Sequence, residues 1–255
     1  MAGIGQRPAG ASAENCTPSE GTAPPALFAR GLSRAFGARR AVRPLTLSLE
    51  AGERLAVIGP NGAGKTTLIR LLATLLRPTS GRLEISGFDA IEEPEEVRRR
   101  LGVVLHETLL YPDLTVEENL RFFARLYGLV DVPERVAAIC GRLDLAGMAR
   151  NRVRRLSRGQ QQRAALARAL LHDPPVLLFD EPDTGLDAAS FERLRGELLR
   201  DTERTIVFST HHAGHALALA TRVLLLQSGR AADLGSAARW SADDLVRAIA
   251  AAAGA

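Results

Sequence analysis

Short apolar runs divide the chain into predicted strands and helices. Runs typical of strands cover residues 27–32, 45–49, 54–59 and 83–86 in the first half, and 176–180, 205–210 and 222–227 in the second. Within them, residues 55–58 (LAVI) and 176–179 (VLLF) are continuously apolar. Such runs are typical of strands buried on both faces of a largely parallel sheet. The pattern predicts an α/β protein in which a long segment separates two halves of one sheet.

That segment, residues 105–173, has the periodicity of helices. Thr115 with Glu118, and Asp131 with Glu134, each match a capping box, in which the cap side chain and the later glutamate satisfy free backbone N–H groups. We expect one helix to begin at each box, the first ending at Gly128. Residues 105–173 are therefore predicted to form an α-helical subdomain inserted into a mixed sheet.

The ends of the chain differ from its interior. Residues 1–25 are rich in Gly, Ala, Ser, Thr and Pro, and side chains of this kind do not offset the entropy cost of ordering. We expect a flexible tail over 1–25, one domain over 26–235, and a C-terminal tail or helix over 236–255.

Composition and charge exclude several classes of protein. No apolar run reaches the roughly 18 residues of a membrane span, and the polar N-terminus lacks a signal-peptide pattern, so we expect neither a spanning helix nor export by that route. Cys16 and Cys140, the only cysteines, build no disulfide framework, which fits a reducing cytoplasm. The 33 basic and 29 acidic residues nearly balance and aromatics make up only 4%, so we expect no nucleic-acid partner.

The strongest chemical motif is the phosphate loop at residues 59–66, GPNGAGKT, which matches G-x-x-x-x-G-K-[ST] between a predicted buried strand and an apolar helical pattern that ends before Pro78. Glycines let backbone N–H groups approach phosphate oxygens, and the helix start adds positive partial charge. We expect Lys65 to bind the β- and γ-phosphates and Thr66 to bind Mg²⁺. The residues expected to hold the nucleotide here are Gly59, Pro60, Asn61, Gly62, Ala63, Gly64, Lys65, Thr66 and Thr67.

Two carboxylates follow the buried strand at 176–180. Asp180 is the candidate second Mg²⁺ ligand, and Glu181 is the candidate group that polarises the attacking water. The alternative is an acidic turn that closes a core strand. The phosphate loop in the same chain favours the catalytic interpretation.

With further segments, these motifs resemble the ATP-binding cassette (ABC) ATPases over residues 27–235. Residues 156–160, LSRGQ, are similar to the family signature, usually LSGGQ; residues 181–187 resemble the D-loop; His211 resembles the switch histidine that contacts the γ-phosphate. The resemblance implies that Ser157, Gly159 and Gln160 bind nucleotide held by a second subunit. Ser157 and Gln160 also match a plain capping box. Phe36 resembles the aromatic residue that stacks on adenine, and its alternative is a core position.

Two positions depart from the family pattern. Arg158 stands where the signature usually has its first glycine, and we expect ATP binding to survive this change. His106 stands where the family usually has the glutamine that touches Mg²⁺ and relays the nucleotide state to the membrane partner. A histidine nitrogen suits a metal-held water, Glu107 is the alternative substitute, and a surface linker histidine is the remaining interpretation.

The resemblance implies a catalytic ATPase, with Lys65, Glu181 and His211 as catalytic residues and ATP and Mg²⁺ as cofactors. It further implies a head-to-tail dimer of this chain bound to an integral membrane permease at the cytoplasmic face of the cell membrane. His106, residues 114–129 and the LSRG segment resemble the ATPase subunit of the heme exporter of cytochrome c maturation. Exporters of drugs, polysaccharide or lipid are an alternative, and a soluble ABC ATPase without a transport role is another.

Overall fold

The computed structural model describes residues 23–184 and 186–253, so most of the predicted N-terminal tail, Cys16 and Gly185 lie outside the described residues. Ten strands form two sheets within the described ranges. An antiparallel sheet has the order β2-β1-β4-β5, with β1 at Leu27–Phe36, β2 at Arg39–Leu49, β4 at Ser80–Ile85 and β5 at Phe88–Asp89. A mixed sheet has the order β10-β9-β3-β8-β7-β6, with β3 at Arg54–Ile58, β6 at Leu101–Val104, β7 at Val176–Asp180, β8 at Thr205–Ser209, β9 at Arg222–Gln227 and β10 at Arg230–Ser236.

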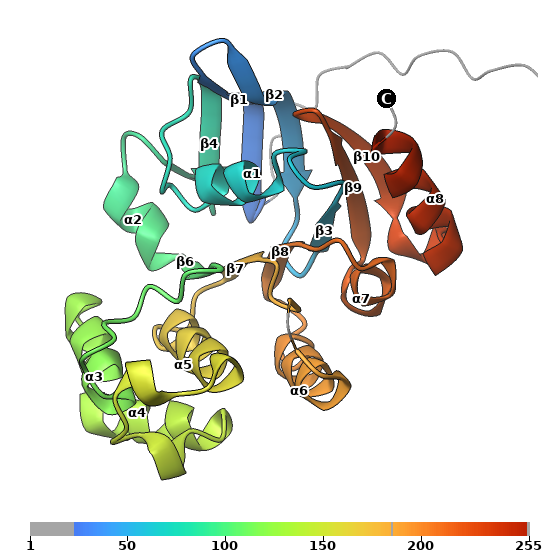
Figure 1. Ribbon diagram of the computed structural model, residues 1–255. Helices are drawn as coiled ribbons and strands as arrows, with labels where there is room; N and C mark the ends of the chain where they lie inside the picture. Colours follow the sequence, from blue (N-terminus) through green and yellow to red (C-terminus); the bar gives the residue numbers. More distant parts are fainter. Residues whose placement is uncertain (1–22, 185, 254–255) are drawn as a thin grey trace, which may run out of the picture.

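The mixed sheet is present as predicted, but the prediction of a single sheet was wrong. In the mixed sheet only β10 runs antiparallel to its neighbour. The runs at 27–32, 45–49 and 83–86 form their own sheet above it (Figure 1). Leu45, Leu47 and Leu49 alternate with more exposed residues in β2, and such alternation is typical of an antiparallel sheet with one buried face.

The strands of the mixed sheet are buried on both faces. Leu55 and Val57 of β3 belong to a core shared with the antiparallel sheet and α1, whereas Ala56 and Ile58 belong to a second core shared with most of the other helices. The helices are α1 (Lys65–Leu72), α2 (Pro94–Arg99), α3 (Val116–Leu126), α4 (Val132–Arg142), α5 (Arg158–Leu170), α6 (Ala188–Leu198), α7 (Ala213–Leu219) and α8 (Ala242–Ala253), with 3₁₀ turns at Ala146–Met148, Val153–Arg155 and Ala237–Arg239. Among the described helices, none is both long and apolar enough to cross a bilayer.

Helices α3, α4 and α5 form a lobe at one end of the mixed sheet (Figure 1). The box at Thr115 caps α3 as predicted, because Thr115 and Glu118 bond each other's backbone N–H groups. The box predicted at Asp131 is absent: α4 begins there, but Asp131 has a φ of 53° and its side chain caps no N–H group. In this left-handed conformation the Asp131 carboxylate accepts no hydrogen bond from the backbone N–H groups of the first helical turn.

The helix behind the phosphate loop is shorter than predicted. It ends at Leu72, well before Pro78, because Thr74 takes a left-handed conformation with φ of 58°. Leu75 and Leu76 then bond back to the Arg70 carbonyl, a pattern typical of helix termination.

The lobe is joined to the mixed sheet around a half-buried histidine. His172, just after α5, stacks on Tyr127 with ring centroids 3.8 Å apart, and its Nε2 lies 3.1 Å from the Leu101 carbonyl of β6. Desolvation by burial lowers the pKa of His172 from 6.5 to about 4. The folded protein therefore holds this imidazole neutral down to mildly acidic pH.

Acid should weaken the fold through His172. Between pH 6.5 and about 4 the unfolded chain binds a proton that the folded chain excludes, so the free energy of unfolding falls as the pH is lowered. In His172→Gln this contribution, up to about 3 kcal/mol, is absent, so stability should fall less steeply than in the unmodified protein. Denaturant unfolding across this pH range measures the slopes, with the exposed His106→Gln as control. Equal slopes for His172→Gln and the unmodified protein would contradict the assignment.

Candidate nucleotide-binding site

The phosphate loop leaves the end of β3 and enters α1 through backbone that requires glycine. A Cβ at Gly59 would lie 2.1 Å from the Leu226 carbonyl oxygen, and one at Gly64 would lie 2.2 Å from the Ala41 carbonyl oxygen. Both glycines also have positive φ, 151° and 108°. Packing against β9 and β2 thus excludes any larger residue at these two positions.

Lys65 lies inside this loop, with only 5% of its surface exposed. Its Nζ donates to the Gly59 carbonyl at 2.8 Å and the Pro60 carbonyl at 3.2 Å, and lies 3.9 Å from Glu181 Oε1. Desolvation by burial lowers the pKa of Lys65, and the charges of Glu181 and Asp180 oppose that shift. The ammonium group now bonds to two neutral carbonyls, and an anionic partner would form stronger, charge-assisted hydrogen bonds with it.

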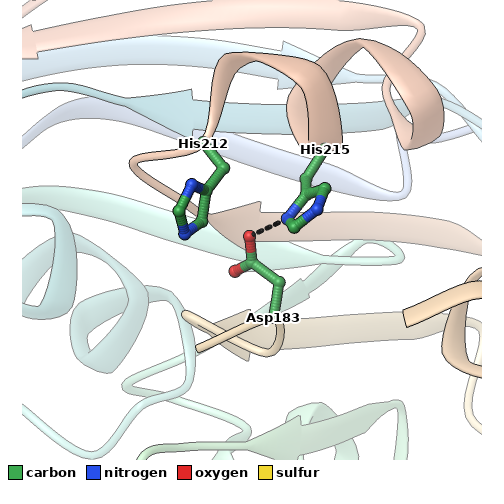
Figure 2. Close-up of side chains that lie close together, drawn as sticks. All are labelled: Asp183, His212 and His215. Atoms are coloured by element: carbon green, nitrogen blue, oxygen red, sulfur yellow. Dashed lines mark hydrogen bonds and ion pairs between the residues drawn. The ribbon is translucent and has the colours of Figure 1, made fainter. Parts of the chain in front are cut away.

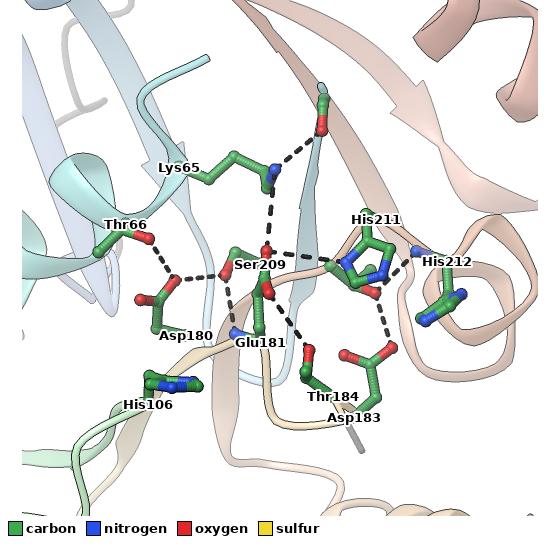
Figure 3. A network of polar contacts seen from close by, with 12 residues as sticks. Lys65, Thr66, His106, Asp180, Glu181, Asp183, Thr184, Ser209, His211 and His212 are labelled. Atoms are coloured by element: carbon green, nitrogen blue, oxygen red, sulfur yellow. Dashed lines mark hydrogen bonds and ion pairs between the residues drawn. The ribbon is translucent and has the colours of Figure 1, made fainter. Parts of the chain in front are cut away.

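The carboxyl ends of β7 and β8 bring a second group of side chains to the loop (Figure 3). Asp180, at the end of β7, is 4% exposed, and its Oδ1 accepts from Thr66 Oγ1 at 3.1 Å and from Ser209 Oγ at 2.7 Å. The predicted pair of magnesium ligands, Thr66 and Asp180, therefore lies in direct contact. Hydroxyl and carboxylate oxygens are the donors that Mg²⁺ prefers, so this pair fits the ion.

Glu181 is held beside Lys65 in a strained conformation. Its φ is 49°, unusual for a residue other than glycine, and its N–H donates to Ser209 Oγ at 2.9 Å. Its Oε2 accepts from Thr184 Oγ1 at 3.2 Å, and its Oε1 lies 3.7 Å from His211 Nδ1. All three predicted catalytic residues, Lys65, Glu181 and His211, thus meet at one point (Figure 3).

A cavity of about 480 Å³ opens above this group. Its lining includes Phe36, Asn61, Lys65, Thr66, Thr67 and Glu181. Phe36 is 47% exposed, so it is not the core residue of the alternative interpretation, although the Arg34 guanidinium lies 4.5 Å from its ring centroid. An exposed aromatic ring in the same cavity as the phosphate loop is a suitable surface for a nucleotide base to stack on.

The signature residues lie elsewhere. Ser157, Gly159 and Gln160 line a different cavity, between α5 and α6, and not the cavity of Lys65. Ser157 and Gln160 do form a capping box at the start of α5. The Ser157 oxygen accepts from the Gln160 N–H, yet its hydroxyl proton remains available for another acceptor. The capping role and the predicted phosphate-binding role are therefore compatible.

Sequence reasoning missed the residue that organises this site. Ser209 Oγ donates to the Asp180 carboxylate and accepts from the backbone N–H of Glu181, so one hydroxyl fixes the Asp180 side chain and the Glu181 backbone. It ends β8, which lies between β3 and β7 in the mixed sheet. The sequence did contain a signal for this role: Ser209 lies near the end of a predicted strand, two positions before His211. The carboxyl ends of parallel strands meet at one edge of the sheet, so a polar residue at this position is expected near the site.

Comparison with known proteins identifies the class. The ABC transporter family model matches residues 42–184, more than half of the chain. The chain is 42% identical over 195 residues to the ABC transporter ATP-binding protein NatA of Bacillus subtilis, a match that covers 74% of this chain and 79% of that protein. The chain belongs to the ABC transporter family. As the ATP-binding subunit, it is the ATPase of such a transporter.

Other ABC transporter proteins agree with this assignment. The daunorubicin resistance ATP-binding protein DrrA3 of Streptomyces coeruleorubidus is 37% identical over 86% of this chain and 70% of that protein. The dimeric, ADP- and phosphate-bound structure of the ATP-binding cassette MJ0796 superposes with a TM-score of 0.72 and 27% identity, covering 82% of this chain and 98% of that one. The α/β fold class predicted from the sequence is confirmed.

The two departures from the ABC pattern contact each other. Arg158 Nη2 lies 3.3 Å from His106 Nδ1, although 52 positions separate these residues. His106 thus reaches the start of α5 and bonds to neither Thr66 nor Asp180 in the described structure. Glu107, the alternative residue, lies 3.8 Å from Arg70 with 73% of its side chain exposed. Of the two residues, His106 is the one that contacts the signature segment, through Arg158.

His106→Gln should therefore be mild, because the glutamine oxygen accepts from Arg158 as the imidazole does, whereas His106→Ala removes the contact. We expect His106→Gln to keep ATP turnover within about 2-fold of the unmodified protein and His106→Ala to lower it further, by an amount typical of an exposed contact, about 1 kcal/mol or less. Glu107→Ala is the matched control and should be silent. Lower turnover in His106→Gln than in His106→Ala, or a loss confined to Glu107→Ala, would contradict this assignment.

Proposed function

We propose that two copies of this chain associate head to tail and enclose two ATP molecules, each between the phosphate loop of one copy and the signature segment of the other. The separation of Ser157 and Gly159 from the Lys65 cavity supports this arrangement, because one chain presents only half of the binding groups at each cavity. The likeness to a dimeric cassette structure supports it further. A helix start that carries Ser157 is a favourable anion site.

In this proposal the phosphates bind the loop N–H groups and Lys65, with the adenine base on Phe36. Thr66 and Asp180 hold Mg²⁺, which would neutralise phosphate charge during transfer. Lys65 releases the carbonyls of Gly59 and Pro60 and turns to phosphate oxygens instead. Because the buried ammonium then gains an anionic partner, binding also offsets its desolvation.

Glu181 is proposed to orient and polarise the water that attacks the γ-phosphate, and His211 to contact that phosphate. Both roles fit the 3.7 Å separation of their side chains and the fixed backbone of Glu181. Loss of the γ-phosphate removes the contacts that join the two copies, so hydrolysis reopens the pair.

We further propose that the pair docks on an integral membrane permease at the cytoplasmic face of the membrane. The lobe carries exposed apolar side chains close to the His106 segment: Tyr111, Phe122 and Leu126 are 50%, 41% and 68% exposed. Phe122 and Leu126 also line a shallow groove on α3. Apolar side chains gathered on one face are typical of a protein interface.

For the cargo we propose export, with heme for cytochrome c maturation as the specific hypothesis. The sequence resemblance of His106, residues 114–129 and the LSRG segment to a heme exporter subunit supports this hypothesis. Drug, polysaccharide or lipid export is the alternative. Identifying the membrane protein that copurifies with this chain from solubilised membranes of its native host tests the choice.

Glu181→Gln tests the catalytic proposal. The amide keeps the size of the side chain but no longer serves as a base, so hydrolysis should slow by at least about 100-fold while ATP binding persists. The variant should accumulate as a dimer in ATP and Mg²⁺, measured by light scattering coupled to size exclusion.

The matched control is Glu203→Gln, which removes an exposed carboxylate just before β8, at the opposite end of that strand from His211. It should hydrolyse ATP normally and show no trapped dimer. Normal hydrolysis by Glu181→Gln would refute the role given to Glu181, and a monomer that binds ATP without turnover would refute the dimer.

A further inference from the structure

Three side chains of types that commonly bind metal ions lie close together beside the nucleotide site without belonging to it (Figure 2). Asp183 lies in the loop after β7, His212 precedes α7, and His215 lies in its first turn. One ligand atom from each residue lies within 4.8 Å of the other two. None of these residues has a part in the ATP or magnesium chemistry proposed above.

Asp183 supplies a buried and incompletely satisfied carboxylate. Its side chain is 2% exposed. Its Oδ2 accepts from Thr210 Oγ1 at 2.7 Å and lies 2.6 Å from His215 Nδ1. Its Oδ1 is buried with no hydrogen-bond partner among the described residues. Figure 2 shows this second oxygen on the side of His212. A buried carboxylate oxygen without a partner is costly unless a cation or a donor reaches it.

The two histidines differ in exposure and in packing. The His215 ring is fixed by stacking on Phe191, with centroids 3.8 Å apart, and 33% of its side chain is exposed. His212 is exposed, and its ring lies 5.0 Å from that of His215. His215 is therefore held in place next to Asp183, whereas the exposed ring of His212 has the His211 ring as a neighbour, with centroids 4.1 Å apart.

We propose that Asp183, His212 and His215 bind a divalent first-row transition ion of the Zn²⁺ or Co²⁺ type. At metal–ligand distances of about 2.1 Å, the ligand atoms of a tetrahedral site lie about 3.4 Å apart. Binding therefore requires that His212 turn inward and that Asp183 and His215, now hydrogen-bonded at 2.6 Å, move slightly apart as the metal replaces the shared proton. Two imidazoles with one carboxylate suit these ions, whereas Mg²⁺ and Ca²⁺ prefer oxygen ligands. Three protein ligands also leave a coordination position open to water.

A metal here would join two segments that flank the catalytic residues. Asp183 follows Glu181 by two positions, and His212 follows His211 directly. A bound ion would link the loop after β7 to the start of α7. The site is thus placed to restrain the segments that carry Glu181 and His211, and it does so without contacting the nucleotide residues Lys65 and Thr66.

Titration with Co²⁺ tests the site directly, because its visible absorption reports nitrogen and oxygen coordination. The chain should carry no affinity tag, should carry Cys16→Ser to remove the N-terminal thiol, and should be kept in excess Mg²⁺. We expect one Co²⁺ per chain, displaced by Zn²⁺. His212→Ala should weaken binding by at least about 10-fold, since loss of a ligand exceeds the effect of losing an outer-shell partner.

His212→Cys should restore binding and add the near-ultraviolet charge-transfer band of a cobalt–thiolate bond. His106→Gln removes a histidine outside the cluster and should bind Co²⁺ as the parent does. His212 is exposed, and thermal melting verifies that its variants remain folded. Absence of stoichiometric Co²⁺ binding in the parent, or equal binding in parent and His212→Ala, would overturn the proposal.

Discussion

A positive charge buried among carbonyl oxygens is the constraint on which the nucleotide site depends. The Lys65 ammonium is almost entirely removed from water, and its partners are two backbone carbonyls and a carboxylate nearly 4 Å away. Burial penalises this cation, as the lowered pKa of Lys65 shows, and phosphate oxygens are the partners that would satisfy it best. The tight packing at Gly59 and Gly64 holds the loop in the shape that makes this burial possible.

The mixed sheet brings the remaining chemistry to that charge. Strand β8 lies between β3 and β7, so Ser209 reaches both Asp180 and Glu181, and Asp180 reaches Thr66 on α1. The helical lobe meanwhile holds Ser157 at a separate cavity. The fold thus places Ser157 and Lys65 at two separate cavities of one chain, and in our proposal a pair of chains brings them together.

Sequence reasoning located groups that lie together in the structure where the motifs are local. The phosphate loop and the Asp180–Glu181 pair are each contained in a few residues after a buried strand, and the carboxyl ends of the parallel strands bring them into contact. It failed where distant segments decide the outcome. The antiparallel sheet, the linking role of Ser209 and the contact between His106 and Arg158 depend on pairings between residues far apart in the chain. At Asp131 the backbone conformation overrode a matching local pattern.

Complementation between two inactive variants tests the central claim most directly. Lys65→Ala removes the buried cation, and Ser157→Asp keeps a capping oxygen but repels phosphate, so each variant alone should lack ATP turnover. In an equal mixture, half of the pairs are mixed and each mixed pair holds one intact site, so turnover should recover to about a quarter of the unmodified value. A mixture no more active than its components would contradict a nucleotide site shared between two copies of this chain.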